Sequence, residues 1–297
     1  MTNPSLLGQA GQALRNVLPV RFRSDLPVVP VVRLSGIIGF STPLRPGLTL
    51  ASCARALDRA FTYRKPAAVA LLINSPGGSA VQSHLIFNRI RKLSEEKAVP
   101  VLAFVEDAAA SGGYMIACAA DEIIADENSI VGSIGVVGGS FGVHRLLDKI
   151  GVERRLYTSG EHKAMLDPFL PEKPEDVARL KAIQREIHES FIALVKGRRG
   201  PVLVESADDL FSGEYWTGRR GLALGLIDGL GDLRTTLRAR FGDQVRTPLI
   251  SAPRSLFGRT APGLSASLWD GLTDRPSFAE DVLSTVEARA LWARLGL

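Results

Sequence analysis

The chain has 297 residues, of which 45% are hydrophobic and 23% are charged, and its formal net charge is +5 at pH 7. These values are ordinary for a globular protein, and the length allows one large domain or two small ones with a sizeable core. The most apolar early stretch, residues 26–38, contains Pro30 and Arg33 and is too short to cross a membrane. Arginines gather near both ends, a pattern that favours a solvated surface over contact with anionic lipid or nucleic acid.

Residues 1–26 are expected to form an arm. Leu6 to Leu18 place apolar residues on one face of a short helix, for which packing or disorder is favoured over a place on a membrane surface. The N-terminus lacks a continuous apolar run before a small-residue cleavage site, so it does not read as a secretory signal. Cys53 and Cys118 are far apart, so we expect two buried thiols and neither a disulfide nor a metal site. These features predict a protein of the cytoplasm or of the periphery of the cytoplasmic membrane.

Strands and helices alternate in the first half of the chain. Apolar runs predict strands at residues 28–34, 69–73, 101–105 and 122–125, and helices at 50–61, 79–93 and from Ser111 onward. Thr49 is the expected N-cap of the first of these helices. The alternation predicts βαβ units, and therefore an α/β domain with a mainly parallel sheet. Sites in such sheets lie at the carboxyl ends of the strands, where both Gly-rich turns of this chain fall.

The second half contains one strongly periodic helix, at residues 175–195. Its apolar side chains recur at spacings of three and four, which predicts an amphipathic helix that faces the core. They are Val177, Leu180, Ile183, Ile187, Phe191 and Leu194. From Phe241 onward the chain is rich in Pro, Gly, Ser and Arg. We therefore expect a main domain over residues 27–240 and an extension over 241–297 that is loosely packed or contacts another subunit.

Two Gly-rich turns contain the candidate catalytic residues. The first is Asn74–Ser79, after the strand at 69–73, and the second contains Ser111 in Ala-Ser-Gly-Gly-Tyr at 110–114. Backbone N–H groups at the start of a helix are unpaired and partly positive, so they would stabilise an anionic intermediate on an attacked carbonyl. One turn is thus expected to supply a nucleophile and the other to complete an oxyanion hole.

The sequences Asn-Ser-Pro-Gly-Gly (74–78) and Ala-Ser-Gly-Gly-Tyr (110–114) resemble those of the signal peptide peptidase A family of serine proteases, which shares the fold of the Clp protease and crotonase superfamily. Further matches follow in family order at residues 131–136, 158–163, 216–219 and 224–228. The resemblance spans roughly residues 28–240. It implies a Clp/crotonase-type core of repeated ββα units with a mainly parallel sheet and flanking helices.

The hydroxyl of Ser111 needs a base that takes its proton. In the Clp proteases a histidine on the segment after the next strand has this role, but here that segment, residues 129–142, contains none. The histidines of the chain are His84, His144, His162 and His188. A lysine held neutral by burial is a known alternative base. In the resembled family that lysine follows a Ser-Gly pair, and Ser-Gly-Glu-His-Lys at 159–163 matches it with Lys163.

The resemblance also implies supporting residues. Ser133 matches a family serine whose hydroxyl contacts the lysine amine, although a plain turn serine between Gly132 and Gly135 fits equally well. Gly78 and Gly112 would donate backbone N–H groups to the oxyanion, since glycine lets a substrate backbone approach closely. The expected chemistry needs no metal, nucleotide or organic cofactor.

The implied function is a serine endopeptidase that hydrolyses extended apolar peptides, such as cleaved signal peptides or fragments of membrane proteins. Longer members of the resembled family fuse two copies of the core and take serine and lysine from different halves. This chain has one copy, so the resemblance implies a ring-like homo-oligomer in which the partner subunit's Lys163 serves Ser111.

Three other interpretations remain. Gly138–Gly142 matches the Gly-x-Ser-x-Gly nucleophile elbow, but the last histidine, His188, lies in a helix with a long stretch of chain after it. A crotonase-like acyl-CoA enzyme would need a carboxylate base near the oxyanion hole, and Glu106 and Asp107 are the acids nearest to Ser111. The third is a non-catalytic scaffold with a protease fold.

Overall fold

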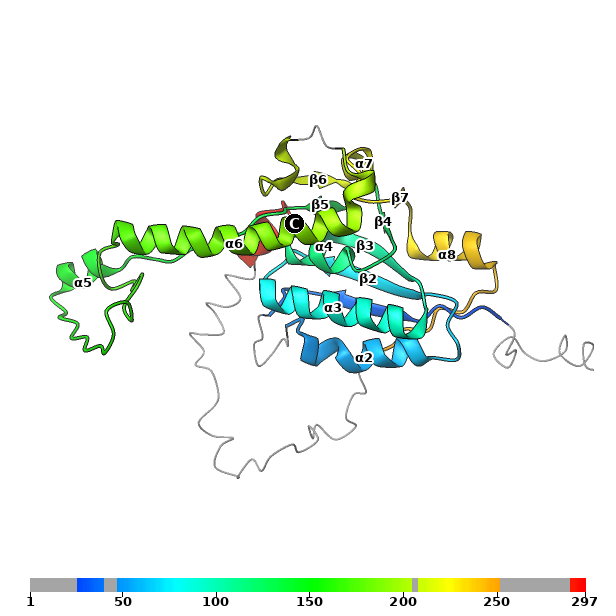
Figure 1. Ribbon diagram of the computed structural model, residues 1–297, viewed down its shortest axis with the longest axis horizontal. Helices are drawn as coiled ribbons and strands as arrows, with labels where there is room; N and C mark the ends of the chain where they lie inside the picture. Colours follow the sequence, from blue (N-terminus) through cyan, green and yellow to red (C-terminus); the bar gives the residue numbers. More distant parts are fainter. Residues whose placement is uncertain (1–25, 40–46, 205–207, 252–288) are drawn as a thin grey trace, which may run out of the picture.

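The structure is a computed structural model that describes residues 26–39, 47–204, 208–251 and 289–297 (Figure 1). Its centre is a seven-stranded sheet in which β1, β2, β3, β4 and β7 follow one another in parallel. β5 pairs in parallel with the end of β3, and β6 is antiparallel to β5. The strands are β1 Val31–Ser35, β2 Val69–Ser75, β3 Val101–Ala110, β4 Glu122–Ala125, β5 Ile130–Gly132, β6 Tyr215–Thr217 and β7 Gly229–Leu230. The predicted α/β fold with a mainly parallel sheet is confirmed.

The predicted helices of the first half are present, and Thr49 is the N-cap of the first one, as predicted. The Thr49 side chain accepts a hydrogen bond from the Ser52 N–H, and the Ser79 side chain accepts one from the Gln82 N–H, so both satisfy an orphan donor of the first turn. The helices are α2 Leu50–Thr62, α3 Ala80–Lys97, α4 Gly112–Ala117, α5 His144–Ile150, α6 Pro174–Arg199, α7 Gly218–Ala223 and α8 Leu233–Phe241.

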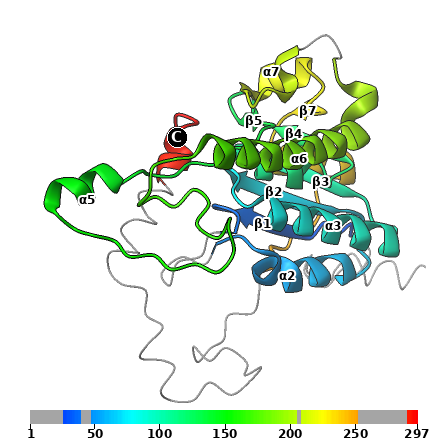
Figure 2. The ribbon, with the colours of Figure 1, turned by 60° about the vertical axis from the view of Figure 1, so that its left-hand side comes forward.

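The two faces of the sheet are covered unequally. Helices α2, α3, α4 and the C-terminal half of α6 lie on one face, where they form the main core with alternate residues of β1 to β4 (Figures 1 and 2). The other face has a smaller core, in which Phe104 and Leu102 of β3 meet Leu237 of α8. Because β2 and β3 are covered on both faces, both read as continuous apolar runs in the sequence.

A long arm projects from this body. It consists of residues 133–173, with α5 near its tip, and the N-terminal half of α6 (Figure 2). The buried residues of α6 are Asp176, Phe191, Val195 and Arg199, and Ile183 of the predicted apolar stripe is 45% exposed. The prediction that this helix faces the core is therefore wrong for its N-terminal half, because that half extends past the edge of the sheet.

The main domain continues beyond residue 240. Val29 donates its N–H to the carbonyl of Arg246 at 2.8 Å, and Ile250 donates to Val31 at 2.8 Å, so residues 246–250 run along β1. The Ile250 side chain is buried. The start of the predicted extension is thus part of the fold. The predicted helix between Leu6 and Leu18 and residues 252–288 lie outside the described residues. Among the residues that are described, none of the helices has both the length and the apolarity to cross a bilayer.

Candidate active site

Ser111 lies in a strained turn between β3 and α4. Its backbone has φ 52° and ψ −121°, a combination that residues with a side chain rarely adopt. Such a conformation costs about 1–3 kcal/mol and persists only where the surroundings enforce it, most often at functional sites. Here the Ser111 N–H donates to the carbonyl of Gly132 at 2.8 Å, which ties the turn to the end of β5.

The first Gly-rich turn lies directly against this serine. A Cβ atom on Gly77 would come within 2.8 Å of the Ser111 Cβ, and a Cβ atom on Gly78 would overlap the carbonyl oxygen of Ile38. Both glycines have positive φ, +105° and +141°. Any side chain at these two positions would push the turns apart, so glycine is required for their close approach.

Gly112 is the first residue of α4, so its N–H has no acceptor within the helix. A Cβ atom at Gly112 would overlap the Oγ atom of Ser83, which itself donates to the Ser79 carbonyl at 2.8 Å. Gly78, Gly112 and Ser111 line one cavity. This arrangement of a hydroxyl beside backbone N–H groups is what an oxyanion hole requires.

The cavity has a volume of about 820 Å³, which is within the usual range for ligand sites. One side is formed by the turn Pro76–Ala80 and by Met115 of α4. The lining also includes Ser133 and residues 135–137 after β5, Ile187 and Phe191 of α6, and the loop before β6. The wall therefore combines apolar side chains with several polar ones, among them Ser111 and Ser133.

Ser133 is the second serine in this cavity. It has φ 54°, and its N–H donates to the Glu214 carbonyl at 2.6 Å. Like Ser111 it follows directly after a strand. The structure thus brings together four of the five residues assigned from the sequence, namely Ser111, Ser133, Gly78 and Gly112.

Lys163 is the fifth, and it is not at the cavity. It lies between α5 and α6 on the projecting arm, where it is exposed (Figures 1 and 2). The burial that a neutral lysine needs is not provided within one chain, since even the nearby Phe169 is 39% exposed. A single copy of the chain therefore does not assemble Ser111 with Lys163.

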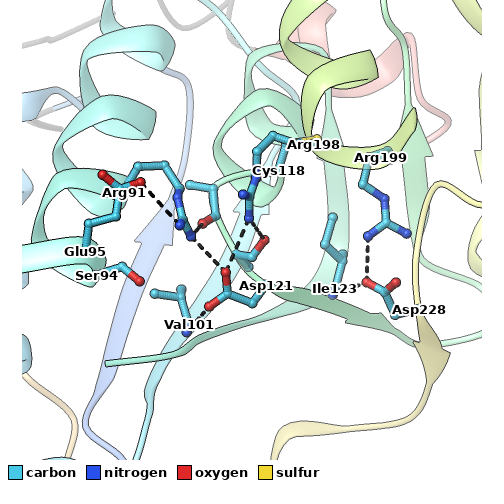
Figure 3. A network of polar contacts seen from close by, with 12 residues as sticks. Arg91, Ser94, Glu95, Val101, Cys118, Asp121, Ile123, Arg198, Arg199 and Asp228 are labelled. Atoms are coloured by element: carbon cyan, nitrogen blue, oxygen red, sulfur yellow. Dashed lines mark hydrogen bonds and ion pairs between the residues drawn. The ribbon is translucent and has the colours of Figure 1, made fainter. Parts of the chain in front are cut away.

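A polar network binds the residues that follow the C-terminal end of α4, the helix that begins after Ser111 (Figure 3). Arg198 donates to the carbonyls of Cys118 and Ala120 at 2.9 and 2.8 Å, and Arg91 donates to the Ala119 carbonyl at 3.2 Å. Asp121 pairs with both arginines, at 2.8 and 3.3 Å. Cations at the C-terminal end of a helix satisfy its last carbonyls and favour the helix dipole. The network therefore anchors the turn that directly follows α4.

The two cysteines are free and buried, as predicted. Burial raises the pKa of the Cys53 thiol to about 11 and that of Cys118 to about 12. Because the thiolate is the reactive form, both thiols are inert near neutral pH. Neither one lines the cavity.

The alternative candidates, the Gly-x-Ser-x-Gly motif and the two acids nearest to Ser111 in sequence, do not lie where their chemistry would require. Ser140 is exposed on the arm, in irregular structure that no strand directly precedes. Glu106 pairs with Arg33, and Asp107 accepts a hydrogen bond from Asn74 Nδ2 at 2.6 Å. Neither carboxylate lines the cavity, so the acids nearest to Ser111 in sequence do not face it.

Other residues at or beside the cavity escaped the sequence analysis. Tyr215 and three residues of the segment 289–297 line the cavity. His188 of α6 does not line it, but its half-buried ring lies against the carbonyl oxygen of Ile134, next to the lining residue Ser133. These residues come from segments far from both turns, and no local motif marks them.

A serine in a strained strand-to-helix turn beside backbone N–H donors, on a mainly parallel sheet, is an arrangement typical of hydrolases that use a serine nucleophile. Comparison with known proteins gives the family. The model of peptidase family S49 matches residues 94–242, which include Ser111 and Lys163. The chain belongs to peptidase family S49.

The similar proteins carry different names. A protein of Synechocystis named as a protease is 34% identical over 239 residues, covering 77% of this chain and 85% of that protein. The chloroplastic serine protease SPPA of Arabidopsis thaliana is 34% identical over 171 residues, covering 57% of this chain and 25% of that protein.

A protein of Brucella abortus named as the Na(+)/H(+) antiporter NhaA is 53% identical over 289 residues. The match covers 96% of this chain and 39% of the Brucella protein, so the chain spans well under half of that relative's length. The shared region includes most or all of the residues that match the S49 model, since so little of this chain lies outside it.

Proposed function

We propose that this protein is a serine endopeptidase that uses Ser111 and Lys163 as a catalytic dyad. The observation that carries the proposal is the strained Ser111, which faces a cavity beside the N–H groups of Gly78 and Gly112. In the first step Ser111 Oγ attacks the peptide carbonyl carbon while its proton passes to the neutral amine of Lys163. The carbonyl oxygen becomes an oxyanion, which the two glycine N–H groups stabilise.

In the second step the C–N bond breaks and the lysine ammonium gives its proton to the departing amine. This leaves an ester between Ser111 and the acyl part of the substrate, with the lysine neutral again. Water then loses a proton to the same amine, attacks the ester carbon and releases the carboxylic acid, and the proton returns to Ser111. The cycle needs no oxidant, metal or cofactor.

The lysine is supplied by a second copy of the chain. Lys163 is exposed on the arm, and the arm also exposes large apolar side chains that a lone subunit leaves in water. These include Phe141 at 79%, Leu146 at 56%, Ile150 at 61% and Tyr157 at 89% exposure. Several large apolar side chains exposed on one projecting segment favour an interaction site. Docking of the arm on a neighbour would bury this surface and bring the partner subunit's Lys163 to Ser111 in a water-poor site.

The substrates we propose are extended apolar peptides, such as signal-peptide remnants or fragments of membrane proteins. Met115, Val136, Ile187 and Phe191 give the cavity an apolar lining that suits such side chains. The backbone next to Gly78 is already extended, since Ile38 forms a parallel bridge with it. A substrate strand that added to this region would be held mainly through main-chain hydrogen bonds.

The decisive experiment combines a fluorophosphonate probe with peptide-library cleavage. The wild type should bind the probe and cleave apolar peptides, and Ser111→Ala should lose both. Ser140→Ala is the matched control, because Ser140 is the serine of the rival Gly-x-Ser-x-Gly motif and is exposed on the arm. Loss of labelling in Ser140→Ala with retention in Ser111→Ala would refute the assignment. Thioester turnover by Ser111→Ala would instead favour a crotonase-like enzyme.

A further inference from the structure

The segment Arg289–Leu297 contributes to the lining of the cavity, although more than a hundred and seventy positions separate it from Ser111 in the sequence. It is the end marked C in Figures 1 and 2. It is helical at residues 289–293. Leu291, Arg294 and Leu295 line the cavity together with Ser111. The Tyr215 hydroxyl donates to the Arg294 carbonyl at 2.8 Å, which fixes the segment to β6.

The segment turns one face toward the cavity. Leu291 and Leu295 are four positions apart, the spacing that places two side chains on the same side of a helical turn. Both are half-buried and line the cavity, whereas Ala293 between them is exposed and does not. The two leucines thus add an apolar surface that neither the sheet nor α6 provides.

The volume of the cavity indicates whether the segment forms part of its wall or fills it. With the segment in place about 820 Å³ remains, and Ser111 still lines that space. Sites for whole ligands commonly measure about 300–1,000 Å³, so a substrate side chain fits without displacing the segment. A segment that filled the site would have left little room beside the serine.

We propose that Leu291 and Leu295 are specificity-determining residues, which form one apolar wall of the substrate cavity and select peptides with a large apolar side chain at that wall. This inference rests on the proposed peptidase function. The leucines touch the substrate but take no part in the movement of protons, so their loss changes the choice of substrate and leaves Ser111 reactive.

The first test measures contact directly. The native thiols are buried, so Leu295→Cys introduces the single accessible thiol among the described residues, and Ala293→Cys gives a matched control on the same turn. The probe is acetyl-Leu-Leu-leucinal, a peptide aldehyde that adds reversibly to a reactive serine. Bound aldehyde should slow maleimide labelling of Leu295→Cys about tenfold by covering the thiol, and should leave the labelling of Ala293→Cys unchanged.

Competition between the aldehyde and the fluorophosphonate for Ser111 separates the possible failures. If the aldehyde blocks the fluorophosphonate but leaves Leu295→Cys labelling unchanged or faster, the wall is refuted while the peptidase function stands. A faster rate would mean that the ligand displaces the segment. If neither reagent reaches Ser111, the proposed function fails and the inference fails with it.

The second test measures selectivity. The ratio of kcat/KM for a peptide with leucine at the selected position to that for its alanine counterpart should fall about tenfold in Leu295→Ser, the usual scale for a lost apolar contact. Ala293→Ser should keep the wild-type ratio, and fluorophosphonate labelling should persist in both variants. An unchanged ratio in the double variant Leu291→Ser, Leu295→Ser would overturn the assignment.

Discussion

The Nε2 atom of His188 lies 3.0 Å from the carbonyl oxygen of Ile134, so helix α6 is joined to the cavity wall one residue after Ser133. A carbonyl oxygen only accepts hydrogen bonds, so the ring must carry its proton on Nε2. The backbone N–H of Ser133 itself donates a hydrogen bond to the carbonyl of Glu214. The conformation of this wall is therefore set by α6 and by the loop before β6.

This contact makes His188 a positioning residue. His188→Gln places an N–H donor near the same point and should keep kcat/KM within about threefold, whereas His188→Leu should lower it about tenfold through loss of one buried hydrogen bond. If His188 only stabilised the fold, the variants would be less stable to heat but their kcat/KM values would not differ. Steady-state kinetics and thermal unfolding of both variants give the comparison, and equal kcat/KM values in both would contradict it.

Subunit complementation tests the shared dyad. Ser111→Ala and Lys163→Ala should each be inactive alone. After random exchange of equal amounts, about a quarter of the head-to-tail interfaces hold an intact Ser111 beside the partner subunit's Lys163, so activity should return to about that fraction. Lys149→Ala, on exposed α5 of the same arm, is the control and should stay active. No recovery despite proven exchange would show that the site is built within one chain.

Lys163→Arg separates a base from a simple charge. Arginine keeps the positive charge but does not release its proton at accessible pH, so this variant should be as inactive as Lys163→Ala. His162→Ala, at the neighbouring exposed position, should retain most of the activity. Peptide hydrolysis by purified variants is the measurement. An active Lys163→Arg together with an inactive His162→Ala would make histidine the base.

The ion pair between buried Arg199 and the partly exposed Asp228 is important for stability. Arg199 is 5% exposed, and it donates to Asp228 at 2.7 Å and to the Gly225 carbonyl. Asp228→Asn leaves the buried guanidinium without its counter-charge, so the free energy of unfolding should fall by about 3 kcal/mol. Glu95→Gln breaks the exposed pair with Arg91 and should change it by less than about 1 kcal/mol. Urea unfolding gives both values, and equal changes would contradict the prediction.

Alkaline pH should weaken the fold through the buried thiols. The pKa of Cys118 rises from 9.0 to about 12 because burial disfavours the thiolate. Above pH 9 the unfolded chain loses this proton while the folded chain keeps it, so stability falls with rising pH until about pH 12, by up to ~1.4 kcal/mol per pH unit. Cys118→Ala should reduce this slope in urea unfolding at pH 8 to 10.5. A slope equal to that of the wild type would show that Cys118 ionises normally.

The sequence by itself determined the local parts of the site. Thr49 indicated the start of α2, because an N-cap acts on N–H groups two or three residues away. The glycines near Ser111 and at Gly78 indicated the two turns. A positive φ or a close approach of two backbones restricts which residue can occupy the position where it occurs. These requirements are short-range, so they can be read from a few consecutive residues.

Only the tertiary structure decided which distant segments meet. It placed Lys163 on an exposed arm, His188 beside Ile134, and Leu291 and Leu295 in the same cavity as Ser111. It also left half of α6 outside the core, although its apolar spacing is the same along its length. Periodicity shows that a helix has an apolar face but not which surface covers it, because burial depends on where the chain directs the whole helix.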